Sequence, residues 1–261
     1  MSATGISQSN LNIASRRNLF RLRDVYRIYG QEPVAVHALD GVSLDIHAGD
    51  FMAIIGPSGS GKSTLLGLLG CLDLPTKGSI KVDQTEITDL EDSERSKLRG
   101  KSIGFVFPQF HLIPHLTALG NVSTALLYRD LTKPEIRQRS LAALEMVGLG
   151  GRYDHRPIEM SGGEQQRVAI ARALVTDPLM ILADEPTGAL DTKTATIVME
   201  IFKNLQSENR AIVLVTHDLE IAEQMDRVVS MRDGKIVADD LRSERTDALE
   251  DRFWEAGKDG K

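Results

Sequence analysis

The sequence predicts an α/β fold built on a mostly parallel sheet. Three short, continuously apolar runs carry this prediction, at residues 51–55, 179–183 and 211–216. Apolar runs of this length are typical of strands buried on both faces of a parallel sheet. With 261 residues, of which 41% are hydrophobic and 26% charged, the chain suits one large domain or a core with a small subdomain.

The N-terminal part follows a different pattern, in which apolar and polar residues alternate. Val42, Leu44 and Ile46 are apolar at every second position, and so are Ile80 and Val82. Strict alternation is typical of half-buried antiparallel strands. We therefore expect an N-terminal antiparallel β-subdomain beside the parallel core.

Helical signals fill much of the remaining chain. Helices are expected at 132–149, from 161 onward, and at about 193–209. Thr132 and Glu135 form a capping box for the first of these, and Ser161 and Glu164 form one for the second. The segment at about 110–157 is therefore a predicted α-helical subdomain inserted between core strands.

The composition argues against several classes of protein. The formal net charge is −6, so we expect no nucleic-acid partner. No apolar run approaches the roughly 18 residues of a membrane-spanning helix. Cys71 is the single cysteine, which allows no intrachain disulfide, fits a reducing compartment and is expected in the core.

A glycine-rich loop follows the first buried run and opens a helix, in which leucines recur at helical spacing. In this context the pattern G-x4-G-K-[ST] binds nucleotide phosphates through converging backbone N–H groups, so we predict the core of a P-loop NTPase. Lys62 would reach the β- and γ-phosphates, and the Ser63 hydroxyl would bind Mg²⁺. The expected nucleotide-binding residues here are Gly56, Pro57, Ser58, Gly59, Ser60, Gly61, Lys62, Ser63 and Thr64. A kinase or a GTPase would fit this loop equally well.

Charged side chains follow two of the buried runs. Asp184 and Glu185 end the run at 179–183, and His217 ends the run at 211–216. Asp184 can hold Mg²⁺, directly or through water, and Glu185 can act as the general base that polarises the attacking water. His217 is expected at the same sheet edge, where it would contact the γ-phosphate or orient Glu185.

A second element suited to phosphates begins the helix at Ser161. Its hydroxyl, the unhindered N–H groups of Gly162 and Gly163, and the helix dipole all favour an anion. One nucleotide rarely needs two such loops from one chain. The simplest interpretation is that each chain supplies half of two composite sites, so the working unit is a dimer.

The segment from Met160 to Arg167, Met-Ser-Gly-Gly-Glu-Gln-Gln-Arg, resembles the signature motif of ABC-transporter ATPase subunits, whose usual first residue is Leu. The resemblance covers about residues 22–237. It implies that the signature of one subunit closes over ATP held by the phosphate loop of the other, in a head-to-tail dimer. It also implies an ABC ATPase domain at 20–239, between a flexible N-terminal tail at 1–19 and a charged C-terminal tail at 240–261.

Further residues extend the resemblance. Tyr29 stands where the family places an aromatic ring that stacks on adenine, with Tyr26 as the competing candidate. The stretch 188–191 resembles the loop that communicates across the dimer. The stretches 70–73 and 110–113 are similar to the macrolide-exporter and lipoprotein-releasing subfamily, whose permeases have few spans and large extracytoplasmic regions.

One position departs from the family pattern. Members usually carry a Gln after Phe107, which contacts Mg²⁺ and the attacking water and heads the loop that grips the permease. Here Pro108 occupies that position and Gln109 follows one residue late. Proline has no side-chain amide and fixes φ. Either Gln109 substitutes as nucleotide and metal contact through a shifted backbone, or the metal lacks one ligand and turnover is slow.

The resemblance implies an ATPase that uses ATP and Mg²⁺ to drive an integral membrane permease from the cytoplasmic face of the inner membrane. Two alternatives have different partners. A mechanotransmission regulator would control envelope or cell-wall enzymes and transport nothing. An ABC ATPase of translation or DNA repair would usually carry two cassettes or a long coiled-coil insertion, and this chain has neither. In this architecture the permease recognises the cargo, so this sequence does not identify it.

Overall fold

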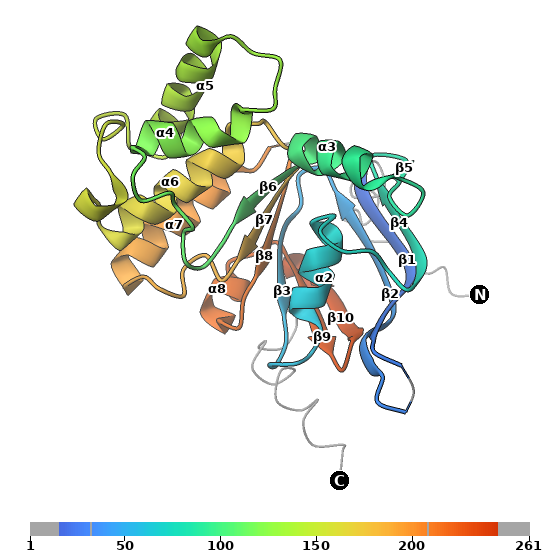
Figure 1. Cartoon of the computed structure of the whole chain (residues 1–261). Coiled ribbons are helices and arrows are strands. Elements are labelled where there is room, and N and C mark those ends of the chain that lie inside the picture. Colours follow the sequence, from blue (N-terminus) through green and yellow to red (C-terminus); the bar gives the residue numbers. More distant parts are fainter. Residues whose placement is uncertain (1–15, 32, 208, 245–261) are drawn as a thin grey trace.

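The core is a six-stranded sheet in the computed structural model, which describes residues 16–31, 33–207 and 209–244 (Figure 1). Its order is β10-β9-β3-β8-β7-β6. These strands are β3 (Phe51–Ile55), β6 (Ile103–Val106), β7 (Met180–Asp184), β8 (Ala211–Val215), β9 (Arg227–Arg232) and β10 (Lys235–Leu241). All neighbours pair in parallel except β9 and β10, so the prediction of a mostly parallel sheet is confirmed.

Strand β3 shows why the predicted runs are continuously apolar. Phe51, Ala53 and Ile55 belong to a hydrophobic cluster shared with helices α6 (Gly162–Leu174) and α7 (Thr192–Leu205). Met52 and Ile54 belong to a second cluster on the other face, shared with α2 (Lys62–Leu69). Both faces of the sheet are therefore covered, and every position of the strand is buried.

The N-terminal residues form a separate antiparallel sheet of order β2-β1-β4-β5. Its strands are β1 (Asn18–Tyr29), β2 (Val36–His47), β4 (Lys77–Val82) and β5 (Thr85–Glu86). Both alternating segments of the sequence are strands, and they lie on either side of β1. The prediction of an antiparallel subdomain is confirmed, although β1 itself was not anticipated and begins inside the expected N-terminal tail.

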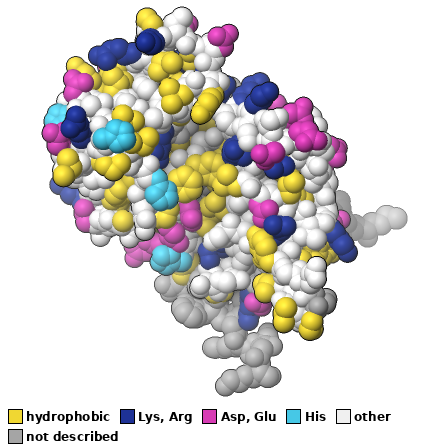
Figure 2. Space-filling view, viewed as in Figure 1, with side chains coloured by type: hydrophobic (Ala, Val, Ile, Leu, Met, Phe, Trp, Pro, Cys, Tyr) yellow, Lys and Arg dark blue, Asp and Glu magenta, His cyan; other side chains and the backbone are white. Residues whose placement is uncertain are grey.

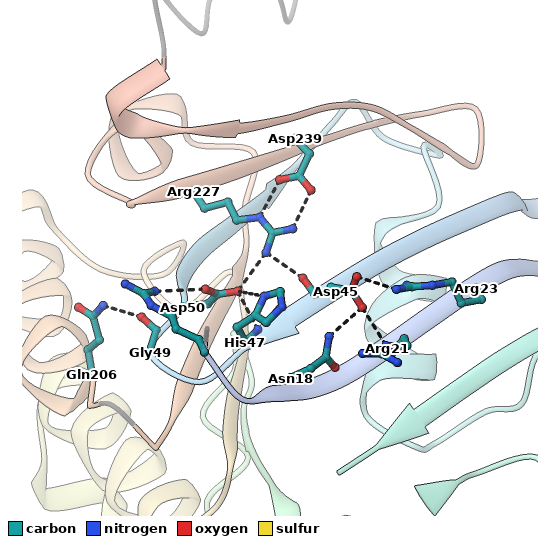
Figure 3. Close-up of polar contacts among 11 residues, drawn as sticks. Asn18, Arg21, Arg23, Asp45, His47, Gly49, Asp50, Gln206, Arg227 and Asp239 are labelled. Carbon is teal, nitrogen blue, oxygen red and sulfur yellow. Dashed lines mark hydrogen bonds and ion pairs between the residues drawn. The ribbon is translucent and has the colours of Figure 1, made fainter. Parts of the chain in front are cut away.

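A half-buried arginine joins this sheet to the core (Figure 3). Arg227, at the start of β9, donates to Asp50 Oδ2 at 3.0 Å and to the Asp45 carbonyl of β2 at 2.8 Å. It also forms a two-bond pair with Asp239 of β10, both bonds being 2.7 Å. Burial opposes the charge of Arg227, but its hydrogen bonds to Asp239 and Asp50, and their negative charges, hold its pKa above the ordinary value. The network fixes the antiparallel sheet on the parallel one.

The inserted segment between β6 and β7 is helical, as predicted. After α3 (Asp92–Ser102), which precedes β6, the chain forms α4 (Ala118–Ser123), η1 (Thr124–Leu126), α5 (Lys133–Met146) and η2 (Pro157–Glu159). Both expected capping boxes are present, at Thr132–Glu135 and at Ser161–Glu164. In Figure 1, α4, α5 and α6 lie together beside the core sheet.

Two predicted helix ends, at 149 and at about 209, were wrong. Helix α5 ends at Met146 because Gly148 takes a φ of 71°, and the Leu149 N–H then donates to the Leu144 carbonyl. Helix α7 ends at Leu205 because Gln206 is extended. Helix α2 ends at Leu69, and Leu72 beyond it is 54% exposed.

The last strand, β10, is followed by a single turn, η3 (Arg242–Glu244). The remainder of the expected charged C-terminal tail, from residue 245 on, falls outside the described residues. Among the helices of the described ranges, none combines the length and the apolar character that crossing a bilayer requires.

Candidate functional site

The phosphate loop connects β3 to α2, and two of its glycines are enforced by close backbone contacts. A Cβ on Gly56 would stand 2.3 Å from the Met231 carbonyl oxygen of β9. A Cβ on Gly61, whose φ is 98°, would stand 2.4 Å from the Ala38 carbonyl oxygen of β2. The loop is thus clamped between the two sheets, and only glycine fits both positions.

Lys62 begins helix α2 and folds over this loop. Its ammonium group donates to the Gly56 carbonyl at 2.7 Å and to the Pro57 carbonyl at 2.9 Å. Burial lowers the pKa of Lys62, and the negative charges of Glu185 and Asp184 oppose that shift. The lysine is therefore within electrostatic reach of the two carboxylates that end β7.

The hydroxyls of the loop differ in exposure. Ser60 is 2% exposed, and its Oγ has no hydrogen-bond partner among the described residues. Ser63 lies exposed on the first turn of α2, and Thr64 is half-buried beside it. A buried, unpartnered hydroxyl in a loop of backbone N–H groups suits a polar ligand such as phosphate.

The end of β7 carries the two acidic residues. Burial raises the pKa of Asp184, the charge of Glu185 adds to this, and the charge of Lys62 opposes it. Glu185 has a φ of 44°, in the left-handed region that residues other than glycine seldom occupy. Such backbone strain is concentrated at functional sites, because the surrounding structure must hold it in place.

The Glu185 carboxylate is held by the residues that end β8. Its Oε2 accepts a hydrogen bond from the Thr216 hydroxyl at 3.1 Å. Its Oε1 accepts from the His217 N–H at 3.0 Å and lies 2.6 Å from His217 Nδ1. The structure thus brings together Glu185 and His217, which are 32 residues apart, with the histidine ring exposed at the site's surface.

At the second anion-binding element, the two glycines have different environments. The Ser161 hydroxyl accepts from the Glu164 N–H, and the Glu164 carboxylate accepts from the Ser161 N–H. A Cβ on Gly163 would stand 2.1 Å from Thr194 Cγ2, so this glycine is needed for packing against α7. A Cβ on Gly162 would meet only Phe110 and Leu190, at 3.7 Å or more, and Gly162 is exposed.

A contact that the sequence interpretation missed joins this helix to the acidic end of β7. Gln166 is fully buried, and its Nε2 donates to the Pro186 carbonyl at 2.6 Å. Its spacing from Gly163 and Ile170 places all three on the buried face of α6, which is the signal that could have identified it. Helix α6, whose start is the predicted second anion-binding element, is therefore tied to the residue after Glu185.

The two tyrosine candidates lie in different surroundings. Tyr29, at the end of β1, is 41% exposed, and its hydroxyl donates to Asp73 Oδ2 at 3.0 Å. Tyr26 is half-buried with its hydroxyl against β2, where a Cβ on Gly41 would stand 3.2 Å away. The exposed ring of Tyr29 is the more accessible to a ligand.

Pro108 and Gln109 form a turn directly after β6. The Phe110 N–H donates to the Phe107 carbonyl at 3.3 Å, and Phe110 and His111 both have positive φ. Arg172 of α6 donates to the carbonyls of Phe110 and His111 at 2.7 and 2.6 Å. The Gln109 side chain is exposed and makes no hydrogen bond within the described ranges, so the structure does not bring it to a defined contact.

A groove of about 470 Å³ lies between this turn, α3 and the helical insertion. Its lining includes Arg99, Phe105, Phe107, His111, Arg172 and Thr176. Hydrophobic side chains gather between the helical and core parts of the surface in Figure 2. The rings of Phe105 and Phe107 are stacked with centroids 5.5 Å apart, which gives the groove an aromatic wall.

Comparison with known proteins gives a consistent result. The family model described as "ABC transporter" matches residues 39–188. The lipoprotein-releasing system ATP-binding protein LolD of Pseudomonas fluorescens is 48% identical over 86% of the chain and 99% of its own length. The macrolide export ATP-binding/permease protein MacB of Chlorobium phaeobacteroides is 49% identical over 87% of the chain and 34% of its own length.

A solved structure shows the same fold. The cassette MJ0796 of Methanocaldococcus jannaschii was determined as a dimer in a post-hydrolysis state with ADP and Pi. It is 44% identical to this chain, with a TM-score of 0.78 over 86% of the chain and 99% of its own.

Proposed function

The chain belongs to the ABC transporter family as an ATP-binding, ATP-hydrolysing subunit of the macrolide-exporter and lipoprotein-releasing type, and from this premise we propose how its residues divide the ATPase cycle. Two copies form the ATPase dimer, which energises a membrane permease. One observation supports the assignment of roles above the others. Lys62 of the phosphate loop and the carboxylates of Asp184 and Glu185 meet at one sheet edge and act on each other electrostatically.

We propose that Ser63 and Asp184 hold Mg²⁺ together with the nucleotide. The donor set fits, because Mg²⁺ in nucleotide sites takes one or two protein oxygens and completes its shell with phosphates and water. In keeping with this, the described residues contain no cluster of three or more His, Cys, Asp or Glu suited to a metal. When bound, the ion would neutralise charge on the β- and γ-phosphates.

We propose Glu185 as the general base. Thr216 and His217 restrict its carboxylate to one orientation, so a lone pair can be kept directed at the attacking water. His217 is close enough to orient Glu185, and its exposed ring leaves it free to contact the γ-phosphate as well.

The Ser161 helix is assigned to the nucleotide of the partner subunit. Ser161 and Gly162 are exposed at the helix start, where backbone N–H groups and the helix dipole can meet an anion from outside the chain. Gln109, one residue beyond the position where the family carries its Gln, remains a proposed metal and nucleotide contact.

Tyr29 is the proposed adenine-stacking residue. Replacing it with Ala should weaken ADP binding about tenfold, because stacking of a base on an aromatic ring contributes roughly 1–3 kcal/mol. Tyr29→Phe, which keeps the ring, should lose far less, and Tyr26→Ala is the matched comparison. Titration calorimetry with ADP and Mg²⁺ measures all three. Equal weakening by Tyr26→Ala and Tyr29→Ala would contradict the choice between the two tyrosines.

Pro108 should slow hydrolysis, because it removes the amide that other members place there. Pro108→Gln is expected to raise the ATP turnover of the assembled complex several-fold, measured as phosphate release. Gln109→Ala separates the two explanations, since it lowers turnover only if Gln109 already substitutes. Unchanged turnover in Pro108→Gln would show that the proline does not impair the site.

We propose that residues 20–239 form the ATPase domain and that the helical part, about 110–157, meets the permease. The groove lined by Phe105, Phe107 and His111 lies between the helical part and the core. A permease helix bound in this groove would therefore contact both parts and respond to movement between them. We accordingly propose that the subunit works at the cytoplasmic face of the inner membrane, held there by its permease.

Isolation of the tagged chain from membranes of its native cell tests the function. We expect an integral membrane protein to co-purify and to increase ATP turnover in the complex. Recovery with an envelope-hydrolase regulator and no transport substrate would favour the mechanotransmission alternative. Recovery without any membrane protein would contradict both.

A further inference from the structure

The loop that follows α2 runs along the end of β1. The Thr76 N–H donates to the Tyr26 carbonyl at 2.7 Å, and the Ile28 N–H donates to the Thr76 hydroxyl at 3.0 Å. Asp73 lies at the start of the same loop. The stretch 70–73, which the ATPase chemistry above does not use, therefore leads directly to the strand that carries Tyr29.

The Asp73 carboxylate is engaged by three donors. Its Oδ2 accepts from Arg27 Nε at 2.8 Å and from the Tyr29 hydroxyl at 3.0 Å. Its Oδ1 accepts from the Leu74 N–H at 2.8 Å. The bond to Leu74 fixes the carboxylate on its own loop, so Asp73 is a stationary anchor for the phenol.

Arg27 completes the arrangement from the other side. The guanidinium carbon lies 4.5 Å from the centroid of the Tyr29 ring, within the range of a cation–π contact. One ring face is thus covered by Arg27 and the hydroxyl is bound by Asp73, while 41% of the residue remains exposed. The phenol is fixed at two points and remains partly exposed.

We propose that Asp73, together with Arg27, is a positioning residue for nucleotide binding, which holds the Tyr29 ring in the orientation that accepts the adenine base. The inference rests on the proposed stacking role of Tyr29. A ring fixed before binding loses less conformational freedom when the base arrives, so pre-organisation increases affinity. Asp73 does not itself touch the nucleotide, and its whole effect should pass through Tyr29.

An ordinary surface ion pair is the simpler explanation of the Asp73–Arg27 contact, and the chain offers a matched control. Asp83, in the turn between β4 and β5, forms an exposed pair with Arg17, the residue before β1. Asp83→Ala should therefore leave ADP affinity unchanged, whereas Asp73→Ala should not.

The test is a double-mutant cycle on the full chain, with the dissociation constant of ADP measured by calorimetry in the presence of Mg²⁺. We expect Asp73→Ala to weaken binding about threefold, since one ordered side chain and its contacts are lost. Tyr29→Ala should weaken it about tenfold, and the double variant should match Tyr29→Ala alone. Tyr29→Phe, which loses only the bond to Asp73, should reproduce the effect of Asp73→Ala.

Each of the other possible results would contradict a different step of the proposal. If the two losses multiply to about thirtyfold in the double variant, Asp73 acts independently of Tyr29 and the inference is wrong. If Arg27→Leu tightens binding, the guanidinium occupies the place of the base. If Tyr29→Ala has no effect, the proposed stacking itself fails. Should Asp73→Ala not fold, Asp73→Asn and Tyr29→Phe give the same comparison, and unchanged affinity in both contradicts the proposal.

Discussion

Glu185→Gln should reduce the ATP turnover of the assembled complex by about 10²–10⁴-fold, the usual contribution of a positioned general base. The substitution removes the basic carboxylate and keeps its size. The glutamine oxygen can still accept from the His217 N–H, so the geometry at the ends of β7 and β8 should persist. Lys62 and the phosphate loop are untouched, and ATP capture should remain intact.

Phosphate release measures turnover, and light scattering with ATP and Mg²⁺ measures the oligomeric state. We expect the Glu185→Gln protein to accumulate as a dimer with ATP, because the step that reopens the dimer is blocked. Glu200→Gln, an exposed position on α7, is the control and should behave as the unchanged protein. A monomer at saturating ATP that keeps full turnover would contradict both the base and the dimer.

A dimer in which Lys62→Ala and Gly162→Asp stand on different subunits should keep about half of its ATP turnover, whereas placing both on one subunit should abolish it. The reason is the composite site. With the changes on separate subunits, one site receives both defects and the other receives none. With both changes on one subunit, each site receives one defect. Sites contained within single chains would give the opposite result.

Gly162→Asp suits this test because it should disturb ligand binding without disturbing the fold. Gly162 is exposed, has room for a Cβ, and lies in the first turn of α6, where a carboxylate is favourable to the helix dipole. The same carboxylate would repel the phosphates of a nucleotide held by the partner. Gly163 is unsuitable, since its Cβ would collide with Thr194. Differently tagged subunits, co-expressed and purified by both tags, give the defined heterodimers.

The sequence predicted most of the architecture because its signals are local. A continuously apolar strand, a capping box and a glycine-rich loop each depend on neighbouring residues, and β3, α5 and the phosphate loop follow from them. Strand β1 carries few such signals, with charged residues throughout its length, and forms because β2 and β4 pair with it from both sides. Helix ends were missed where an apolar residue such as Leu149 packs beyond the last turn.

The candidate site also contains residues that local motifs predict and contacts that they do not. Lys62, Asp184 and Glu185 could be identified from motifs, because their positions relative to a strand end are fixed by the chain itself. The tie from Gln166 to Pro186, and the three-way contact of Arg27, Tyr29 and Asp73, join segments that are distant in the sequence. Such contacts depend on how loops pack after folding. Periodicity shows that Gln166 is buried and does not show what it binds.

The hydrogen bond between Gln166 and Pro186 should affect when the two nucleotide sites of the dimer act relative to each other. It ties the loop beside the proposed base, Glu185, to the helix that we propose faces the nucleotide of the other subunit. When phosphate leaves one site, a shift of this loop should therefore first change the contacts to the nucleotide in the opposite site. Through this bond, the loss of phosphate at one site should alter how tightly the opposite site holds its nucleotide.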